Sequence, residues 1–267
     1  MRLPVVCWKL LRAMAHAVGG WCTIRFRFPR MSPDAQAREV ERWSRRMLEI
    51  FGITLQVQGT PPAHGPVLLI VNHISWLDIL TIHAARHVRF VAKSNIKGWP
   101  VIGSLSTGAG TLYIERERRR DAMRLVHHMA EALRGGDLIA VFPEGTTGDG
   151  RTLLPFHANL LQAAISAGAP VQPAALRFAL SSSGETSYAP AYVDDDTLLQ
   201  SVWRTLSAPP LTAYVRFGQP QDSDGRERRA WSAALHAEVQ ALRAQTEARE
   251  PVCAHGANSA SSAGSVG

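Results

Sequence analysis

VLLIVNHISWLD, residues 67–78, places a polar segment directly after five consecutive apolar residues. A short run rich in valine and isoleucine is typical of a strand that is buried on both faces, as in a parallel sheet. His73 and Asp78 therefore come at the end of a buried strand, where a fold can hold them rigidly and still leave them reachable. Imidazole titrates near neutrality, and a carboxylate can fix its tautomer and stabilise the imidazolium. We interpret His73 as a general base and Asp78 as the carboxylate that orients it.

The same segment has two other interpretations. A histidine beside the start of a helix is often a structural hydrogen-bonding residue with no catalytic role. Ser75 is a second candidate for the chemistry, as a nucleophile, but no Gly-x-Ser-x-Gly elbow surrounds it or occurs elsewhere in the chain. A serine hydrolase is therefore not indicated. We expect Ser75 to cap the helix that begins near Trp76.

Strands and helices alternate from residue 67 onward, which predicts an α/β fold with a mostly parallel central sheet flanked by helices. Apolar runs predict further strands at residues 53–57, 88–92, 111–114, 138–142, 171–179 and 212–217. Helices are expected at residues 33–51, 79–85, 99–105, 117–134, 160–167 and 230–248. We expect three parts: N-terminal amphipathic membrane-associated helices at 1–51, one α/β domain at 52–249, and a disordered Ala-, Ser- and Gly-rich tail at 250–267.

The first helix is apolar but is interrupted by charge. Lys9, Arg12 and His16 come too early and too often for a signal-peptide core or a membrane span. At about 100° per residue, they fall together with Arg2 on one narrow stripe of a helix that is otherwise apolar. This pattern is typical of a helix that lies in the membrane interface. Packing against the protein's own core is the alternative.

We expect the first helix to break at Gly19 and Gly20. Beyond the break, basic and aromatic residues alternate at Arg25, Phe26, Arg27, Phe28 and Arg30. Such a fringe suits anionic headgroups, as does the net charge of +7. Aromatic residues are too scattered among the basic ones to indicate nucleic-acid binding. The three cysteines are far apart and predict neither a disulfide framework nor a metal site, which favours a reducing, cytoplasmic setting.

Two more polar segments follow predicted strands. Arg116 comes just after the strand at 111–114, where a guanidinium can bind a phosphate with two hydrogen bonds. The alternative is that Arg116 is one more charge in a charged run. The second segment, FPEGTTGDG at 142–150, has glycines that allow backbone N–H groups to face an anion, although it is not a P-loop. A tight turn explains its glycines but does not explain Glu144.

Four segments, in this order and spacing, resemble the motifs of the glycerolipid acyltransferase family, whose bacterial members include 1-acyl-sn-glycerol-3-phosphate acyltransferases. The family pattern is Asn-His, four residues and Asp; then Gly with Ile and Arg; then Phe-Pro-Glu-Gly-Thr; then Val-x-Pro. Here the four stand as Asn72, His73 and Asp78; Gly110, Ile114 and Arg116; residues 142–146; and Val171 with Pro173. The first and third motifs are specific, and the other two are short. The resemblance implies that residues 52–249 form an acyltransferase domain.

The resemblance also implies a mechanism. His73 is the general base that removes a proton from the hydroxyl of an acceptor lysolipid, and Asp78 orients it. The hydroxyl then attacks the thioester of acyl-CoA or acyl-ACP directly, with no further cofactor. The implied product is phosphatidic acid, made from lysophosphatidic acid at the cytoplasmic face of the cell inner membrane by a peripheral or monotopic enzyme. An anionic membrane surface is therefore an expected partner.

The resemblance also implies which residues bind the acceptor. Arg116 is implied in binding the glycerol phosphate of the acceptor, together with Glu144, Gly145 and Thr146. Lys93, at the end of the strand at 88–92, is expected to assist. Glu144 is an awkward ligand for a phosphate because of its charge, so we expect it to bind a hydroxyl or to hold Arg116 and the loop in place.

One departure from the family concerns the acceptor. The family often shows Pro-Phe-Lys-x-Gly after the third motif, whereas this chain has Pro-Phe-His-Ala-Asn at residues 155–159. Loss of that lysine removes a fixed positive charge, so lyso-ornithine lipid is an alternative acceptor. A different class of function is a non-catalytic membrane lipid-binding protein, but the intact His73 and Asp78 speak against it.

Overall fold

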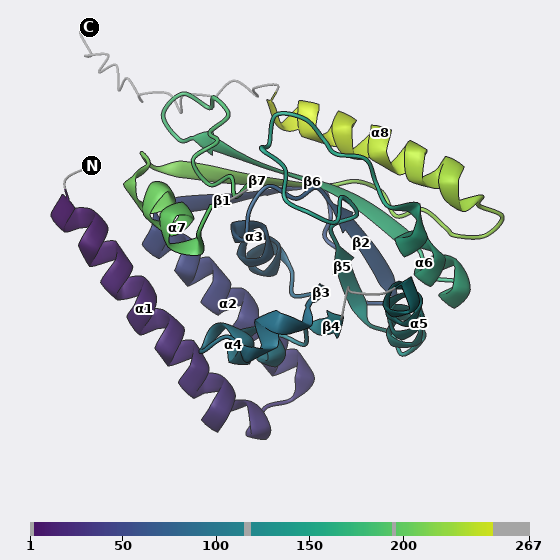
Figure 1. Ribbon diagram of the computed structural model, residues 1–267, viewed down its shortest axis with the longest axis horizontal. Coiled ribbons are helices and arrows are strands. Elements are labelled where there is room, and N and C mark those ends of the chain that lie inside the picture. The colour runs from purple at the N-terminus through teal and green to yellow at the C-terminus, as the bar shows by residue number, and fades with distance from the viewer. Residues whose placement is uncertain (1–2, 115–118, 194–195, 248–267) are drawn as a thin grey trace, which may run out of the picture.

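The computed structural model describes residues 3–114, 119–193 and 196–247, and it shows an α/β fold with helices on both faces of a central sheet (Figure 1). The sheet has seven strands in the described part of the chain, in the order β1-β7-β6-β2-β5-β3-β4. Adjacent strands are parallel except β6 and β7. The strands are β1 Ile53–Gln58, β2 Val67–Val71, β3 Arg89–Lys93, β4 Leu112–Ile114, β5 Leu138–Val141, β6 Val171–Leu180 and β7 Leu211–Phe217. The predicted fold class is confirmed.

Eight α-helices lie in the described segments. They are α1 Leu3–Phe26, α2 Pro33–Phe51, α3 Leu77–Ala85, α4 Ile102–Gly108, α5 Arg119–Arg134, α6 Leu161–Ala167, α7 Leu198–Ser207 and α8 Arg228–Glu247. Short 3₁₀ helices are η1 Phe28–Arg30, η2 Ser94–Gly98 and η3 Ala158–Leu160. In Figure 1, α5, α6 and α8 lie at the opposite side of the molecule from α1, α4 and α7.

Strand β2 lies in the middle of the sheet and faces two hydrophobic cores. Leu69 and Val71 pack into the core that contains residues of α1, α2 and α3. Leu68 and Ile70 pack into the core that contains residues of α5, α6 and α8. Because successive side chains point to opposite faces, a strand between two cores has to be apolar at every position. This explains the unbroken run from 67 to 71.

The predicted break in the first helix is wrong. Helix α1 continues through Gly19 and Gly20 as far as Phe26. Gly20 is buried against the ring of Trp43, and a Cβ atom there would overlap the indole. The glycine therefore allows α1 to approach α2 closely, and it does not end the helix.

Other expectations differ from the structure in smaller ways. The helix expected at 99–105 begins at Ile102 and is preceded by η2. Helix α7 was not expected, although Thr197 and Gln200 form a capping box at its start. Residue 248, the tail at 250–267 and Arg116 lie outside the described residues. The division of the chain at residues 51 and 249 stays a prediction.

A buried histidine packs inside the helical layer. His83 of α3 is 4% exposed, and its ring stacks on His87 at 5.4 Å between ring centroids. Burial lowers the pKa of His83 to about 3, and the neighbouring His87 adds to the effect. His83 is therefore neutral in the native protein at pH values where the unfolded chain already binds a proton.

We expect His83 to make the folded state pH-sensitive. Its contribution is fully present above the unfolded pKa of 6.5 and is lost as the pH falls toward 3. From pH 6.5 to 5 the loss amounts to about 2 kcal/mol of unfolding free energy. Denaturant unfolding of His83→Phe over this range is expected to show a shallower pH dependence than the parent. His64→Asn, a change at an exposed histidine, is the control, and equal slopes in the parent and His83→Phe would contradict the assignment.

Candidate active site

The carboxyl ends of β2, β3, β4 and β5 lie at the same edge of the sheet, because these neighbouring strands are parallel. His73 follows β2, Glu144 follows β5, and Lys93 is the last residue of β3. Strand β4 ends at this edge too, but Arg116, two residues after it, lies outside the described residues. Open α/β sheets bind their ligands at this edge.

His73 and Asp78 are in direct contact. The Nδ1 atom of His73 is 2.8 Å from Oδ2 of Asp78. The same oxygen accepts the backbone N–H groups of Ile74 at 2.6 Å and Ser75 at 2.8 Å. Asp78 is fully buried and lies in the first turn of α3, where the helix dipole favours a carboxylate. One carboxylate oxygen thus fixes both the imidazole and the backbone of the 72–78 turn.

The contact with Asp78 also determines which ring nitrogen of His73 is available. Oδ2 of Asp78 accepts the N–H groups of Ile74 and Ser75, so the geometry assigns it the same acceptor role toward Nδ1 of His73 and leaves Nε2 as the ring nitrogen that can take a proton. The side chain of His73 is 17% exposed, whereas that of Asp78 is inaccessible. The ring is stacked on Phe142, with 3.8 Å between centroids and 6° between planes. The structure therefore holds the imidazole in one plane and leaves part of it open.

Asn72 anchors the start of the turn to the neighbouring strand. Its side-chain amide donates to the backbone oxygen of Leu176 at 3.0 Å, and its side-chain oxygen accepts the N–H of Leu176 at 2.7 Å. Asn72 belongs to the first motif, but the motif does not indicate what its side chain binds. Its partner is 104 residues away in the chain, so the amide itself was the only local signal.

Glu144 joins the 72–78 turn to the loop after β5. Its Oε1 accepts the backbone N–H of His73 at 2.6 Å, and its Oε2 accepts that of Leu154 at 2.8 Å. The side chain is 5% exposed. Burial raises the pKa of Glu144, and the two N–H donors partly oppose this shift. Both oxygens are committed to backbone groups, which favours a role in positioning over direct contact with a substrate.

The glycine-rich loop at 142–150 wraps over the 72–78 turn. Gly148 donates its backbone N–H to the carbonyl oxygen of His73 at 2.8 Å. Gly145 has a φ of +73°, and a Cβ atom there would lie 2.9 Å from Cδ2 of His157. A side chain at this position is therefore opposed both by the backbone and by the imidazole. Thr146 follows on the exposed side of the loop.

Sequence reasoning missed a third segment, which runs between β6 and α7 and covers the turn. Tyr192 donates its backbone N–H to the carbonyl oxygen of Ile74 at 3.0 Å. The indole N–H of Trp76 donates to Oγ of Ser201 in α7 at 3.1 Å. Nothing in the sequence pairs these positions, because the second contact spans 125 residues.

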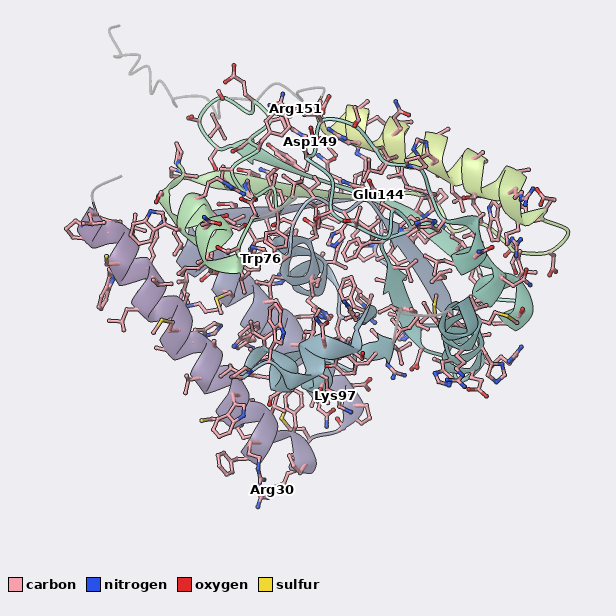
Figure 2. The ribbon with its side chains drawn as sticks, in the orientation of Figure 1. Arg30, Trp76, Lys97, Glu144, Asp149 and Arg151 are labelled. Carbon is pink, nitrogen blue, oxygen red and sulfur yellow. The ribbon has the colours of Figure 1, made fainter. Side chains whose placement is uncertain are left out.

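The structure brings His73, Asp78, Glu144 and Gly145 together. Lys93 is exposed at the same edge, but β5 separates its strand from β2. Figure 2 labels Glu144 and Trp76; Glu144 is buried and Trp76 is partly buried. Within the described residues, no group of three or more histidine, cysteine, aspartate or glutamate side chains is placed to hold a metal ion.

Comparison with known proteins gives the same answer as the motifs. Residues 53–177 match the family model described as Acyltransferase. A 1-acyl-sn-glycerol-3-phosphate acyltransferase of Neisseria meningitidis is 39% identical over 186 residues, which are 69% of this chain and 72% of that protein. A lyso-ornithine lipid O-acyltransferase of Pseudomonas aeruginosa is 31% identical over 231 residues, which are 85% of this chain and 88% of that protein.

A solved structure shows the same fold. The crystal structure of the 1-acyl-sn-glycerophosphate acyltransferase of Thermotoga maritima covers 92% of this chain and 96% of its own, with a TM-score of 0.72 and 19% identity. The fold and the sequence relatives together define an enzyme that transfers acyl groups. The chain belongs to the acyltransferase family, as its motifs predicted.

We expect Glu144→Ala to destabilise the protein, because it leaves the N–H groups of His73 and Leu154 without their acceptor. The free energy of unfolding should fall by about 2 to 4 kcal/mol, measured by denaturant titration with circular dichroism. Glu131→Ala is the matched control, since Glu131 is 58% exposed and pairs with an exposed histidine. We expect it to change stability by less than about 0.5 kcal/mol. Equal stability of the two variants would argue against the positioning role.

Proposed function

We propose that the protein transfers an acyl group from a thioester to the free hydroxyl of a lysolipid, and that lysophosphatidic acid is the acceptor and phosphatidic acid the product. The observation that carries this proposal is the His73–Asp78 contact, which leaves Nε2 of His73 ready to accept a proton. The names of the relatives support the substrate class, because they describe acylation of 1-acyl-sn-glycerol-3-phosphate or of lyso-ornithine lipid. The donor is acyl-CoA or acyl-ACP.

The proposed reaction needs no acyl-enzyme. Nε2 of His73 takes the hydroxyl proton while the oxygen attacks the thioester carbonyl, and Asp78 stabilises the imidazolium. The ester bond forms, the C–S bond breaks, and the leaving thiolate takes the proton from His73. Ser75 is a poor nucleophile for an alternative route, because it is fully buried and its Oγ accepts the N–H of Leu77 at 3.3 Å.

A second acceptor, lyso-ornithine lipid, is favoured by one local observation. Where the family often has a lysine, this chain has His157, whose ring packs against Gly145 in the glycine-rich loop. The fixed positive charge that would meet a phosphate is thereby absent at this position. In favour of lysophosphatidic acid are Lys93 at the same edge of the sheet and Arg116 in the sequence just beyond β4.

A panel assay separates the two acceptors. The purified protein is offered lysophosphatidic acid and lyso-ornithine lipid, each with acyl-CoA and with acyl-ACP, and the acylated product is measured. We expect the higher kcat/KM with lysophosphatidic acid. Robust activity on lyso-ornithine lipid with little on lysophosphatidic acid would show that lyso-ornithine lipid, and not lysophosphatidic acid, is the acceptor. Absence of acylation with every pair would contradict both.

We expect His73→Ala to lower kcat about 10²- to 10⁴-fold at saturating substrate, because the general base is lost. Asp78→Asn should lower it by a comparable factor, since the amide no longer holds Nδ1–H of the ring in place. His64→Ala, at an exposed histidine, is the control and should retain full activity. Circular dichroism checks that the variants are folded. Unchanged acyl transfer by His73→Ala would remove His73 from the mechanism.

We also propose that the protein works on the surface of a membrane, with α1 in the interface. The outer face of α1 is apolar, with exposed large side chains at Leu3, Val5, Trp8, Leu11, Met14, Val18, Trp21 and Phe26. Patches of this extent on soluble proteins usually mark a protein or membrane contact. Basic residues follow at the end of α1, and Figure 2 shows Arg30 and Lys97 at that end of the molecule. The two acyl donors considered, acyl-CoA and acyl-ACP, are intracellular. This favours the cytoplasmic face of the inner membrane as the place where the protein works.

The polar stripe of α1 faces the protein. Lys9 donates to the carbonyl oxygen of Phe51 at 3.2 Å, and burial lowers its pKa. The ring of His16 stacks on Trp43 with 5.0 Å between centroids, and the indole N–H donates to the His16 carbonyl at 3.1 Å. Helix α1 therefore packs on the protein through Lys9 and His16 together with the buried Val6, Ala13 and Gly20, and it turns a second apolar side outward. Among the described helices, none has the length and apolar character to cross a bilayer.

We expect Trp8→Glu with Leu11→Glu to release the protein from anionic vesicles. Burial of each of these side chains contributes about 1.5 to 3 kcal/mol, so the pair should lower vesicle affinity about 100-fold or more. Cosedimentation with phosphatidylglycerol-containing vesicles measures the effect. The control is Met123→Glu, a change at a residue of α5 that is 72% exposed but lies on the opposite side. Undiminished sedimentation of the double variant would count against α1 as the anchor.

A further inference from the structure

Helix α7 has two different faces. Ser201, Thr205 and Leu206 are buried against the rest of the protein. On the other side, Leu199 is 68% exposed and Trp203 is 38% exposed. A capping box at Thr197 stabilises the start of this short helix, so both apolar side chains are presented from a fixed backbone.

The exposed apolar residues of α7 belong to a larger surface. Fifteen large hydrophobic residues are exposed in the described part of the chain, of which eight lie on α1 and two on α7. Trp99 and Ile102, just before and at the start of α4, add two more. Helix α1 contacts both α4 and α7, and Figure 1 shows the three helices on the same side of the molecule. We call this surface, formed by the outer faces of α1 and α7 with Trp99 and Ile102, the apolar face.

We propose that α7 is a second bilayer contact, with Leu199 and Trp203 inserted beside α1 into the same lipid surface. The inference rests on the membrane association proposed above for α1, and it adds a contact 170 residues or more further along the chain. Continuity with α1 and the basic residues near the far end of the apolar face favour an anionic bilayer as the occupant. Tryptophan suits the interface, because its ring is apolar and its N–H is polar.

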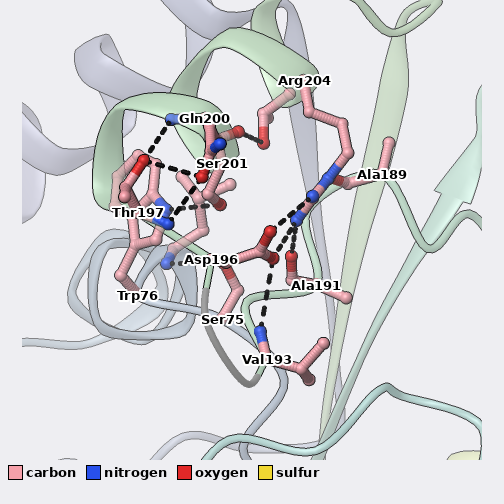
Figure 3. Close-up of polar contacts among 12 residues, drawn as sticks. Ser75, Trp76, Ala189, Ala191, Val193, Asp196, Thr197, Gln200, Ser201 and Arg204 are labelled. Carbon is pink, nitrogen blue, oxygen red and sulfur yellow. Dashed lines mark hydrogen bonds and ion pairs between the residues drawn. The ribbon is translucent and has the colours of Figure 1, made fainter.

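The charged residue of α7 is used inside the protein. The Arg204 guanidinium donates to both carboxylate oxygens of Asp196, at 3.1 and 2.7 Å, and to the carbonyl oxygens of Ala189 and Ala191 (Figure 3). Its hydrogen bonds lower the pKa of Asp196. Arg204 thus holds the segment that leads into α7. No charged side chain of α7 accompanies Leu199 and Trp203 on its exposed side.

The same helix is fixed to the 72–78 turn. Oγ of Ser201 accepts the indole N–H of Trp76, which lies between His73 and Asp78 in the sequence (Figure 3). The segment held by Arg204 includes the backbone bond from Tyr192 to Ile74. Helix α7 therefore lies between the proposed lipid surface and the turn. In this arrangement α7 fixes the distance between His73 and the bilayer surface. A fixed distance suits a lysolipid acceptor whose acyl chain stays in the membrane while its hydroxyl reaches His73.

The test compares two double variants of the full-length protein. Leu199→Glu with Trp203→Glu places two charges on α7, and Met123→Glu with Val57→Glu places two charges at exposed apolar residues outside the apolar face. We expect the first to lower affinity for phosphatidylglycerol-containing vesicles by about tenfold or more. Its KM for a long-chain lysolipid embedded in vesicles should rise by a similar factor. Its kcat/KM for a water-soluble short-chain lysolipid should equal that of the parent. The second variant should behave as the parent in all three measurements.

Three outcomes would overturn the proposal. If both double variants bind vesicles as the parent does, α7 is not part of the contact. If both lose the same affinity, the loss is an effect of added charge and not of the position on α7. A change in oligomeric state on ultracentrifugation in the first variant alone would assign the α7 surface to a second copy of the chain. If the first variant does not fold, Leu199→Ser replaces it, because Leu199 is mostly exposed. Absence of acyl transfer by the parent would refute the proposed function, whereas the vesicle measurements would still decide the role of α7.

Discussion

Oδ2 of Asp78 accepts hydrogen bonds from His73, Ile74 and Ser75, and the shape of the 72–78 turn depends on these three bonds. The backbone donors supply hydrogen bonds to this carboxylate inside the protein, where a polar group without partners would be unfavourable. The fixed carboxylate in turn sets the tautomer and the plane of His73. Two further segments, the loop at 142–150 and the segment before α7, bind the backbone of the turn from outside. The site is therefore built by backbone contacts around the buried side chain of Asp78.

The strands could be predicted from the sequence because β2 and β6 are buried on both faces and their ends are marked by polar residues or prolines. The same reasoning predicted that polar residues at the strand ends form the site. It therefore identified His73, Asp78 and Glu144 as candidate site residues. A role of Glu144 in holding the loop could be expected, but its partners could not, because His73 is 71 residues away and no local pattern shows which backbone N–H a carboxylate will reach. Glycine was misjudged at Gly20, since a sequence does not distinguish a residue that breaks a helix from one that admits a neighbouring ring.

Helix α1 shows a different limit of sequence reasoning. Its narrow polar stripe was visible at once, but the direction of the stripe was not, because the groups that bind it belong to α2. Carbonyl oxygens of Phe51 and Trp43 lie opposite Lys9 and His16, so the polar side of α1 finds its partners within the protein. An amphipathic helix usually packs its apolar side inward. In α1 the buried apolar residues Val6 and Ala13 share the inward side with Lys9 and His16, and a further set of apolar side chains is left exposed, which suits a lipid surface.

Asn72 has a consequence for how a chain can leave a sheet. A primary amide carries a donor and an acceptor in one plane, as a peptide group does, so its paired bonds with Leu176 reproduce with a side chain the pairing of two strands. The side chain of Asn72 thereby continues the pairing with β6, and the main chain is free to turn at this residue. A carboxylate at this position would lack the donor, and an aliphatic residue would lack both groups. Asparagine thus allows a sharp exit from the centre of a sheet while Leu176 of the neighbouring strand keeps a partner for both its N–H and its carbonyl group.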